Sequence, residues 1–146
     1  MSIVVVIGLP CSGKSHLLKD FEKEGFIIHD DFISQFYNGK LLQDLLVNIN
    51  THKVCVADPR LCMLPIFTKF IEQIKEITSD IHLILYENNP SACLNNLKNR
   101  DDGLRRLTHT HKKGIDNNIR EFSNKYDLTN YKNYSHEIIP VYFELL

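Results

Sequence analysis

Apolar residues gather along the chain in short runs that polar and turn-forming residues separate. Runs of four to six residues that contain β-branched or aromatic side chains, bounded by glycine, asparagine, aspartate or proline, predict strands. Four such runs precede residue 87, and a fifth near the C-terminus can close the same sheet. The predicted strands are 3–7, 26–29, 53–57, 81–86 and 138–143.

Between these runs, apolar residues recur at the spacing of one face of a helix. Gly25 ends the first of these segments, and Pro90 suits the first turn of another. The segment 100–114 has many charges and weak apolar periodicity, so we expect an exposed loop there. The predicted helices are 12–24, 32–50 as one or two helices broken near Asn38 and Gly39, 66–77, 90–99 and 115–126.

Strands that alternate with helices predict an α/β fold with a parallel sheet, here of five strands, right-handed crossovers and helices on both faces. The expected architecture is a three-layer sandwich. A length of 146 residues suits a single domain, 1–146, so catalysis and the binding of a second substrate would share one core.

Composition restricts the partners of this domain. The formal net charge of −1 argues against a surface that coats nucleic acid without specificity. No basic leader segment and no apolar run of membrane-spanning length is visible, so we expect a cytosolic protein, cellular or viral, with no membrane partner. The four cysteines form no C-x-x-C pair, which favours reduced thiols: Cys11, Cys55, Cys62 and Cys93.

Residues 8–15 read G-L-P-C-S-G-K-S, the pattern of a phosphate-binding loop, and they stand between a predicted strand and a predicted helix. Backbone N–H groups of such a loop surround a β-phosphate, Lys14 reaches the β and γ oxygens, and Ser15 can hold Mg²⁺. The alternative is a glycine-rich turn. We therefore expect ATP or GTP with Mg²⁺, bound by Gly8, Pro10, Cys11, Ser12, Gly13, Lys14 and Ser15.

Carboxylates follow the second and third predicted strands, at the edge where open α/β sheets bind ligands. Asp30 is the candidate general base that takes the proton of an acceptor hydroxyl, and Asp31 is a candidate for acceptor binding. The alternative for this pair is a helix N-cap. Asp58 is the candidate that orients Mg²⁺ or its waters, and the alternative is a turn residue before Pro59.

A local excess of positive charge follows the fourth predicted strand. Between Leu97 and Arg120 seven lysines and arginines stand against three aspartates, which predicts either a solvated face or a lid over phosphate. We assign 100–114 as the lid, with Arg105 and Arg106 catalytic and Arg100 contacting the nucleotide. His109 and His111 are too few ligands for zinc.

With these residues in place, the chain resembles the P-loop kinases of the nucleotide-kinase-like group, and within it most resembles the kinase domain of bacteriophage-type polynucleotide 5′-hydroxyl kinases. The resemblance implies that Asp30 is the general base, that the lid arginines contact ATP, and that the phosphate-loop strand lies in the centre of the sheet, flanked by the third and fourth strands. That family has an acceptor-phosphate arginine where this chain has Ile33, and Arg60 is the candidate replacement.

The expected activity is phosphoryl transfer from ATP or GTP to an acceptor, with a nucleic-acid or nucleotide 5′-hydroxyl as the first candidate. A nucleoside-monophosphate kinase needs acceptor-phosphate arginines in the 30–50 region, where this chain has none. The sequence is also compatible with a kinase for a small metabolite and with a non-catalytic regulatory nucleotide binder.

Overall fold

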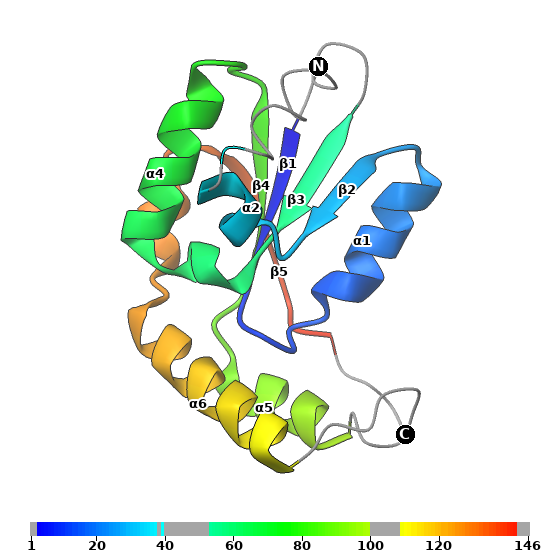
Figure 1. Ribbon diagram of the computed structural model, residues 1–146, viewed down its shortest axis with the longest axis vertical. Helices are drawn as coiled ribbons and strands as arrows, with labels where there is room; N and C mark the ends of the chain where they lie inside the picture. The colour runs from blue at the N-terminus through cyan, green and yellow to red at the C-terminus, as the bar shows by residue number, and fades with distance from the viewer. Residues whose placement is uncertain (1–2, 38, 40–52, 100–108, 143–146) are drawn as a thin grey trace.

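Five parallel strands form one sheet in the computed structural model, which describes residues 3–37, 39, 53–99 and 109–142. The strand order is β2-β3-β1-β4-β5 (Figure 1). The phosphate-loop strand is therefore central and is flanked by the third and fourth strands, as the resemblance implied. The strands are β1 Ile3–Ile7, β2 Ile27–Asp30, β3 Val54–Ala57, β4 Ile81–Tyr86 and β5 Ser135–Ile139.

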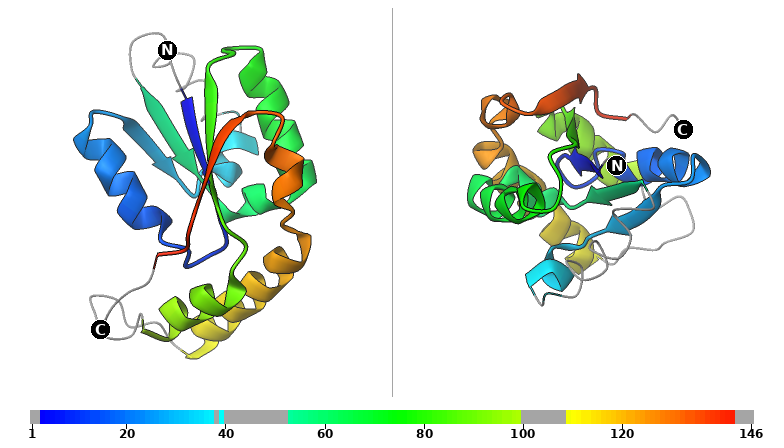
Figure 2. Two further views of the ribbon diagram at one scale, coloured as in Figure 1. Left: turned by 180° about the vertical axis from the view of Figure 1, so that it is seen from behind. Right: turned by 90° about the horizontal axis from the view of Figure 1, so that it is seen from above.

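Helices cover both faces of this sheet, which confirms the predicted three-layer α/β architecture (Figure 2). Helix α1 connects β1 to β2, which lies at one edge of the sheet, and α4 connects β3 to β4 in the opposite direction. Because such crossovers are right-handed, the two helices lie on opposite faces of the sheet. The elements are α1 Lys14–Lys23, α2 Ile33–Tyr37, α4 Leu64–Lys75, α5 Pro90–Asn99 and α6 His109–Lys125, with 3₁₀ turns η1 Pro59–Cys62 and η3 Leu128–Tyr131.

The strands β1 and β3 are apolar throughout, as suits interior strands that helices cover on both sides. Every residue of β1 and β3 is buried, which is the pattern of interior strands in parallel sheets. Val5 pairs in register with Val56 on one side and with Leu83 on the other. The rigid centre of the sheet thus ends directly at residue 8, where the phosphate-loop motif begins.

Two sequence predictions differ from the structure near the charged segment and the C-terminus. Residues 109–114, predicted as loop, form the first turns of α6, because contacts with α5 support a helix whose own apolar periodicity is weak. The last strand, predicted at 138–143, is β5 at Ser135–Ile139. Backbone pairing with β4 is enough to form a strand at the edge of a sheet, where most side chains stay exposed, so this strand needs no apolar run. The predicted helix over 32–50 is seen only as α2, and 40–52 lie outside the described residues.

Buried tyrosines and phenylalanines fix the later elements on the core. The Tyr126 hydroxyl at the end of α6 donates to the Tyr86 carbonyl at 2.6 Å, and the Tyr131 hydroxyl donates to the Leu61 carbonyl at 2.6 Å. Phe67 packs edge-on against Tyr131 at 4.7 Å between ring centroids.

Within the described part of the chain, no helix combines the length and apolar character needed to cross a membrane.

Candidate functional site

The loop between β1 and α1 depends on its glycines for two different reasons. A Cβ at Gly8 would lie 2.7 Å from the Ser12 hydroxyl oxygen, so this position has no room for a side chain, while its backbone angle is not left-handed. Gly13 has φ 102°, and a Cβ there would collide with Tyr142. Cys11, which is not a glycine, also has a left-handed backbone angle, φ 65°, and this conformation costs some strain energy.

Lys14 is buried and folds back into its own loop. Its Nζ donates to the carbonyls of Gly8 at 3.0 Å and Leu9 at 2.7 Å, and to the Ser12 hydroxyl at 3.2 Å. Burial lowers the pKa of the Lys14 ammonium, while the nearby Asp30 carboxylate acts in the opposite direction. An anion bound in the loop would favour the charged form of this buried ammonium.

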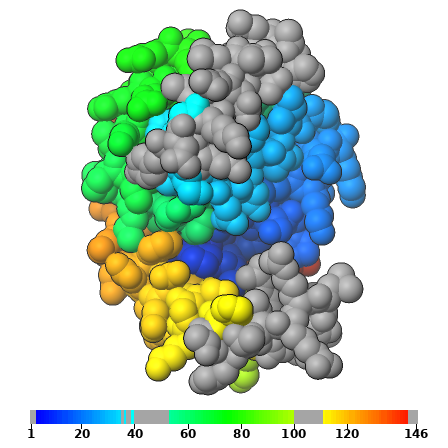
Figure 3. Space-filling view, viewed as in Figure 1, coloured from blue at the N-terminus to red at the C-terminus, as the bar shows by residue number. Residues whose placement is uncertain are grey.

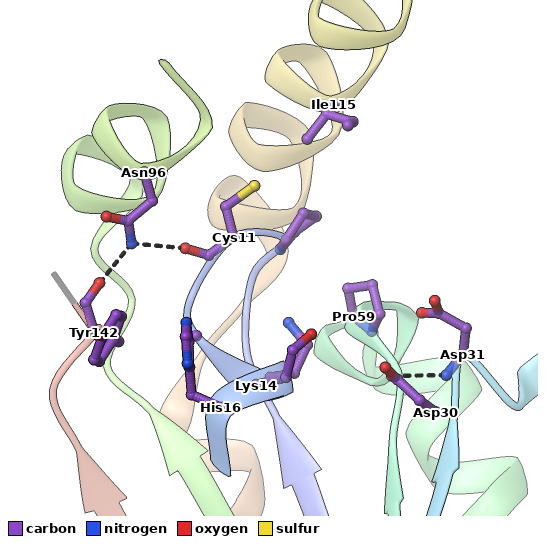
Figure 4. Close-up of a pocket in the computed structure, with 12 residues that line it drawn as sticks. Cys11, Lys14, His16, Asp30, Asp31, Pro59, Asn96, Ile115 and Tyr142 are labelled. Atoms are coloured by element: carbon purple, nitrogen blue, oxygen red, sulfur yellow. Dashed lines mark hydrogen bonds between the residues drawn. The ribbon is translucent and has the colours of Figure 1, made fainter. Parts of the chain in front are cut away.

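A pocket of about 230 Å³ opens beside the loop. In Figure 3 the blue N-terminal residues are visible between the yellow first turns of α6 and the lighter blue residues that follow α1. Figure 4 shows Asp30 and Asp31 at one end of the pocket, Lys14 in the middle, and Asn96 and Tyr142 at the other end. The lining residues are Pro10, Cys11, Gly13, Lys14, Ser15, His16, Asp30, Asp31, Pro59, Asn96, Ile115 and Tyr142.

The two carboxylates at the end of β2 share a strained turn. Asp31 has φ 49°, and its N–H lies 2.8 Å from the Ala57 carbonyl and 2.9 Å from Asp30 Oδ1, so it can donate to both. Partial desolvation and then the neighbouring Asp31 carboxylate raise the pKa of Asp30 above its usual value. A carboxylate of raised basicity at a pocket wall is suited to accept a proton.

Asp58 is enclosed at the end of β3 and accepts four hydrogen bonds. Its oxygens receive the N–H of Ile33 at 3.0 Å, the N–H of Arg60 at 2.9 Å, and the Arg60 Nε and Nη2 at 2.9 and 2.7 Å. The side chain is fully buried. The carboxylate that accepts a hydrogen bond from the first N–H of α2 is thus that of Asp58, and the same carboxylate caps the η1 turn.

We expect Asp58→Asn to lower the free energy of unfolding by about 1–3 kcal/mol, because an amide nitrogen would face the donors of Ile33 and Arg60. Urea unfolding measures this. Unchanged stability together with a shifted Mg²⁺ requirement would instead favour the metal role predicted from the sequence.

The structure brings together some predicted site residues and separates others. The loop residues Lys14 and Ser15 share the pocket with Asp30 and Asp31. Arg60 pairs with Asp58, and its neighbour Pro59 in the same turn lines the pocket. Arg100, Arg105 and Arg106 lie outside the described residues, so their lid role stays a prediction.

Several lining residues had no clear signal in the sequence. His16 directly follows the loop motif, and its position alone could have suggested it. Asn96 and Tyr142 reach the loop from distant parts of the chain: Asn96 bonds a carbonyl 85 positions away. The Tyr142 ring lies 4.4 Å from the His16 ring, centroid to centroid. Only the tertiary fold makes them neighbours of the loop.

The residues present fit a phosphate chain with Mg²⁺. Gly13 has a left-handed backbone angle, Lys14 is a buried cation, and Ser15 is exposed at the pocket. Mg²⁺ commonly keeps several waters and binds one or two protein oxygens together with phosphate. No group of three or more acidic, histidine or cysteine side chains able to hold a metal by itself occurs among the described residues.

No family model matches the chain. Solved structures with a similar fold include the following two. Shikimate kinase from Bacteroides thetaiotaomicron aligns with a TM-score of 0.53 and 12% identity over 96% of this chain and 86% of that chain. A structure from the PezAT chromosomal toxin-antitoxin system of Streptococcus pneumoniae aligns with a TM-score of 0.54 and 15% identity over 96% of this chain and 68% of that chain. The fold is therefore that of the P-loop NTPases, and it resembles the P-loop kinases.

A much closer relative is found by sequence. The chain is 38% identical over 144 residues to uncharacterized protein R277 of Acanthamoeba polyphaga mimivirus, and the match covers 96% of both chains. Identity at this level over nearly the full length of both proteins shows common descent, so the chain belongs to the same family as mimivirus protein R277.

Proposed function

We propose that the protein is a phosphotransferase that moves the γ-phosphoryl group of ATP or GTP to an acceptor hydroxyl. The observation that carries this proposal is that Lys14 and Ser15 of the phosphate loop line the same pocket as Asp30. A triphosphate on the loop and a hydroxyl beside Asp30 would then meet in one cavity. The similarity to P-loop kinases in fold supports the same reaction class.

Each of these side chains has a definite task in such a reaction. Lys14 would turn from the Gly8 and Leu9 carbonyls to the β and γ oxygens and offset their charge. Mg²⁺, held by the Ser15 hydroxyl and the phosphates, would supply further neutralisation. Asp30 would accept the proton of the acceptor hydroxyl. At the same time the hydroxyl oxygen would bond to the γ-phosphorus, and the bond from this phosphorus to the leaving nucleoside diphosphate would break.

The acceptor that we propose first is a nucleic-acid or nucleotide 5′-hydroxyl. Its support is the pair Asp30 and Asp31 after β2, which the chain has in common with polynucleotide 5′-hydroxyl kinases. Arg60 is held by Asp58, so an acceptor phosphate would have to compete with that ion pair. Shikimate kinase, a solved structure of similar fold, favours a small metabolite as the second candidate.

Phosphoryl transfer can be tested with ATP labelled at the γ-phosphate and a panel of acceptors. We expect label in 5′-hydroxyl DNA or RNA above label in any nucleoside monophosphate, because a monophosphate needs convergent cations on its own phosphate. Transfer to the oligonucleotide should fall as salt rises, since each phosphate contact releases counterions.

The outcomes of this panel separate the candidates. Label only in a small metabolite would reject the 5′-hydroxyl acceptor and keep the phosphotransferase assignment. Triphosphate binding without transfer to any acceptor or to water would favour a non-catalytic regulatory role.

A further inference from the structure

Asn96 on α5 joins the phosphate loop to the C-terminal segment. Its side chain is only 6% exposed. The carboxamide Nδ2 donates to the Cys11 carbonyl at 2.9 Å and also to the Tyr142 carbonyl (Figure 4). One amide group thus satisfies two backbone acceptors, one in the loop and one in the chain that follows β5.

The segment after β5 makes a second bond to the next residue of the loop. The Tyr142 N–H donates to the Ser12 carbonyl at 3.0 Å. The carbonyls of Cys11 and Ser12 are therefore both held by donors from outside the loop, at the point where Cys11 adopts φ 65°. Because C=O and N–H point in opposite directions across a trans peptide, holding the Cys11 carbonyl supports the bond that the Ser12 N–H donates to the Leu9 carbonyl at 3.2 Å, and holding the Ser12 carbonyl fixes the direction of the Gly13 N–H.

We propose that Asn96 is a positioning residue that holds the phosphate loop in its binding geometry through the Cys11 carbonyl and, by way of Tyr142, the Ser12 carbonyl. The proposal rests on the proposed function of the loop as a triphosphate site. Loop N–H groups that are already oriented before the anion arrives lose little free energy when it binds. Asn96 preserves that orientation from a helix outside the motif.

An asparagine is suited to this place because its NH₂ group has two donors for two carbonyl acceptors. Aspartate has the same shape, but when ionised it only accepts hydrogen bonds and would face both carbonyls with negative charge. Asn96→Asp therefore removes the two bonds without leaving a cavity. Asn96→Ala is a second variant that removes the same bonds with no added charge.

The chain offers a matched control in Asn88. Its Nδ2 also donates to two backbone carbonyls, those of Ser123 at 2.8 Å and Tyr126 at 3.0 Å, at the end of α6. Asn88→Asp should therefore lower stability by a similar mechanism at a place away from the loop. Asn95→Asp, at an exposed position of α5 next to Asn96, controls for the added charge.

Two measurements test the proposal. Hydrogen exchange of the nucleotide-free protein should become faster in peptides covering 8–16 for both Asn96 variants and stay unchanged there for the two controls. Calorimetry with Mg²⁺ and a non-hydrolysable ATP analogue should give roughly tenfold weaker binding for the Asn96 variants, since two hydrogen bonds contribute to loop geometry. Both are read at a temperature where thermal unfolding shows every variant folded.

Two results would overturn the proposal: unchanged exchange in 8–16 for the Asn96 variants, or equal loss of affinity in Asn88→Asp and Asn96→Asp. The second result would mean that affinity follows general stability. If the unmodified protein fails to bind the ATP analogue, the proposed function is rejected, and the exchange result alone decides whether Asn96 fixes the loop.

Discussion

Replacing Lys14 with alanine is expected to lower phosphoryl transfer by about 10²–10³-fold, the loss seen when one preorganised donor to developing charge is removed. Lys14 is the buried cation among the residues that line the pocket, and no other lysine or arginine among the described lining residues could take its place. Triphosphate affinity should fall as well, because charge-assisted hydrogen bonds to the β and γ oxygens are lost. Label transfer and calorimetry measure the two effects.

A loss of folding must be separated from a loss of binding, since Lys14 also donates to Gly8 and Leu9 within the loop. Lys14→Met loses the ammonium and its hydrogen bonds but keeps most of the buried apolar chain, so it should fold cooperatively and still fail to transfer phosphate. Lys19→Ala, on the exposed side of α1, is the control for charge. Normal ATP binding and turnover in Lys14→Met would reject the phosphate-loop assignment.

The centre of the fold could be predicted from the sequence because its signals are local. A fully buried parallel strand needs a continuous apolar run, which β1 has, and the bounds of both β1 and β4 are those predicted. The loop motif needs a strand before it and a helix after it, and residues 8–15 have both. The predicted positions of Asp30 and Asp31 also follow from this local order, because parallel strands end at the same edge.

The contacts that complete the site could not be predicted from the sequence, because they depend on long-range packing. Asp58 was predicted near the metal, and in the structure its oxygens accept from Ile33 and Arg60. No periodicity shows that Asn96 reaches Cys11, since the two residues meet only after α5 packs over the loop. The weak apolar pattern of 109–114 likewise gave no sign that neighbouring α5 would support a helix there.

Replacing Asp30 with asparagine is expected to lower turnover by about 10²–10⁴-fold while leaving triphosphate affinity near normal, because the variant keeps the shape of the side chain and loses the proton acceptor. Asparagine can still accept the Asp31 N–H, so the turn at the end of β2 should persist. Single-turnover rates and calorimetry separate the two quantities. Asp20→Asn, on the exposed side of α1, removes the same charge away from the pocket.

The pH dependence gives this prediction its sharpest test. Desolvation and then the Asp31 carboxylate raise the folded-state pKa of Asp30, so the acid limb of the rate profile should lie above the usual range of an aspartate and should disappear in Asp30→Asn. A raised folded-state pKa also means that the native state binds this proton more tightly than the unfolded chain does. The stability linked to Asp30 is therefore present at low pH and is lost as pH rises through that pKa. Near neutral pH, Asp30→Asn should consequently unfold no earlier than the unmodified protein, and near-normal turnover combined with earlier unfolding would assign Asp30 a structural role instead.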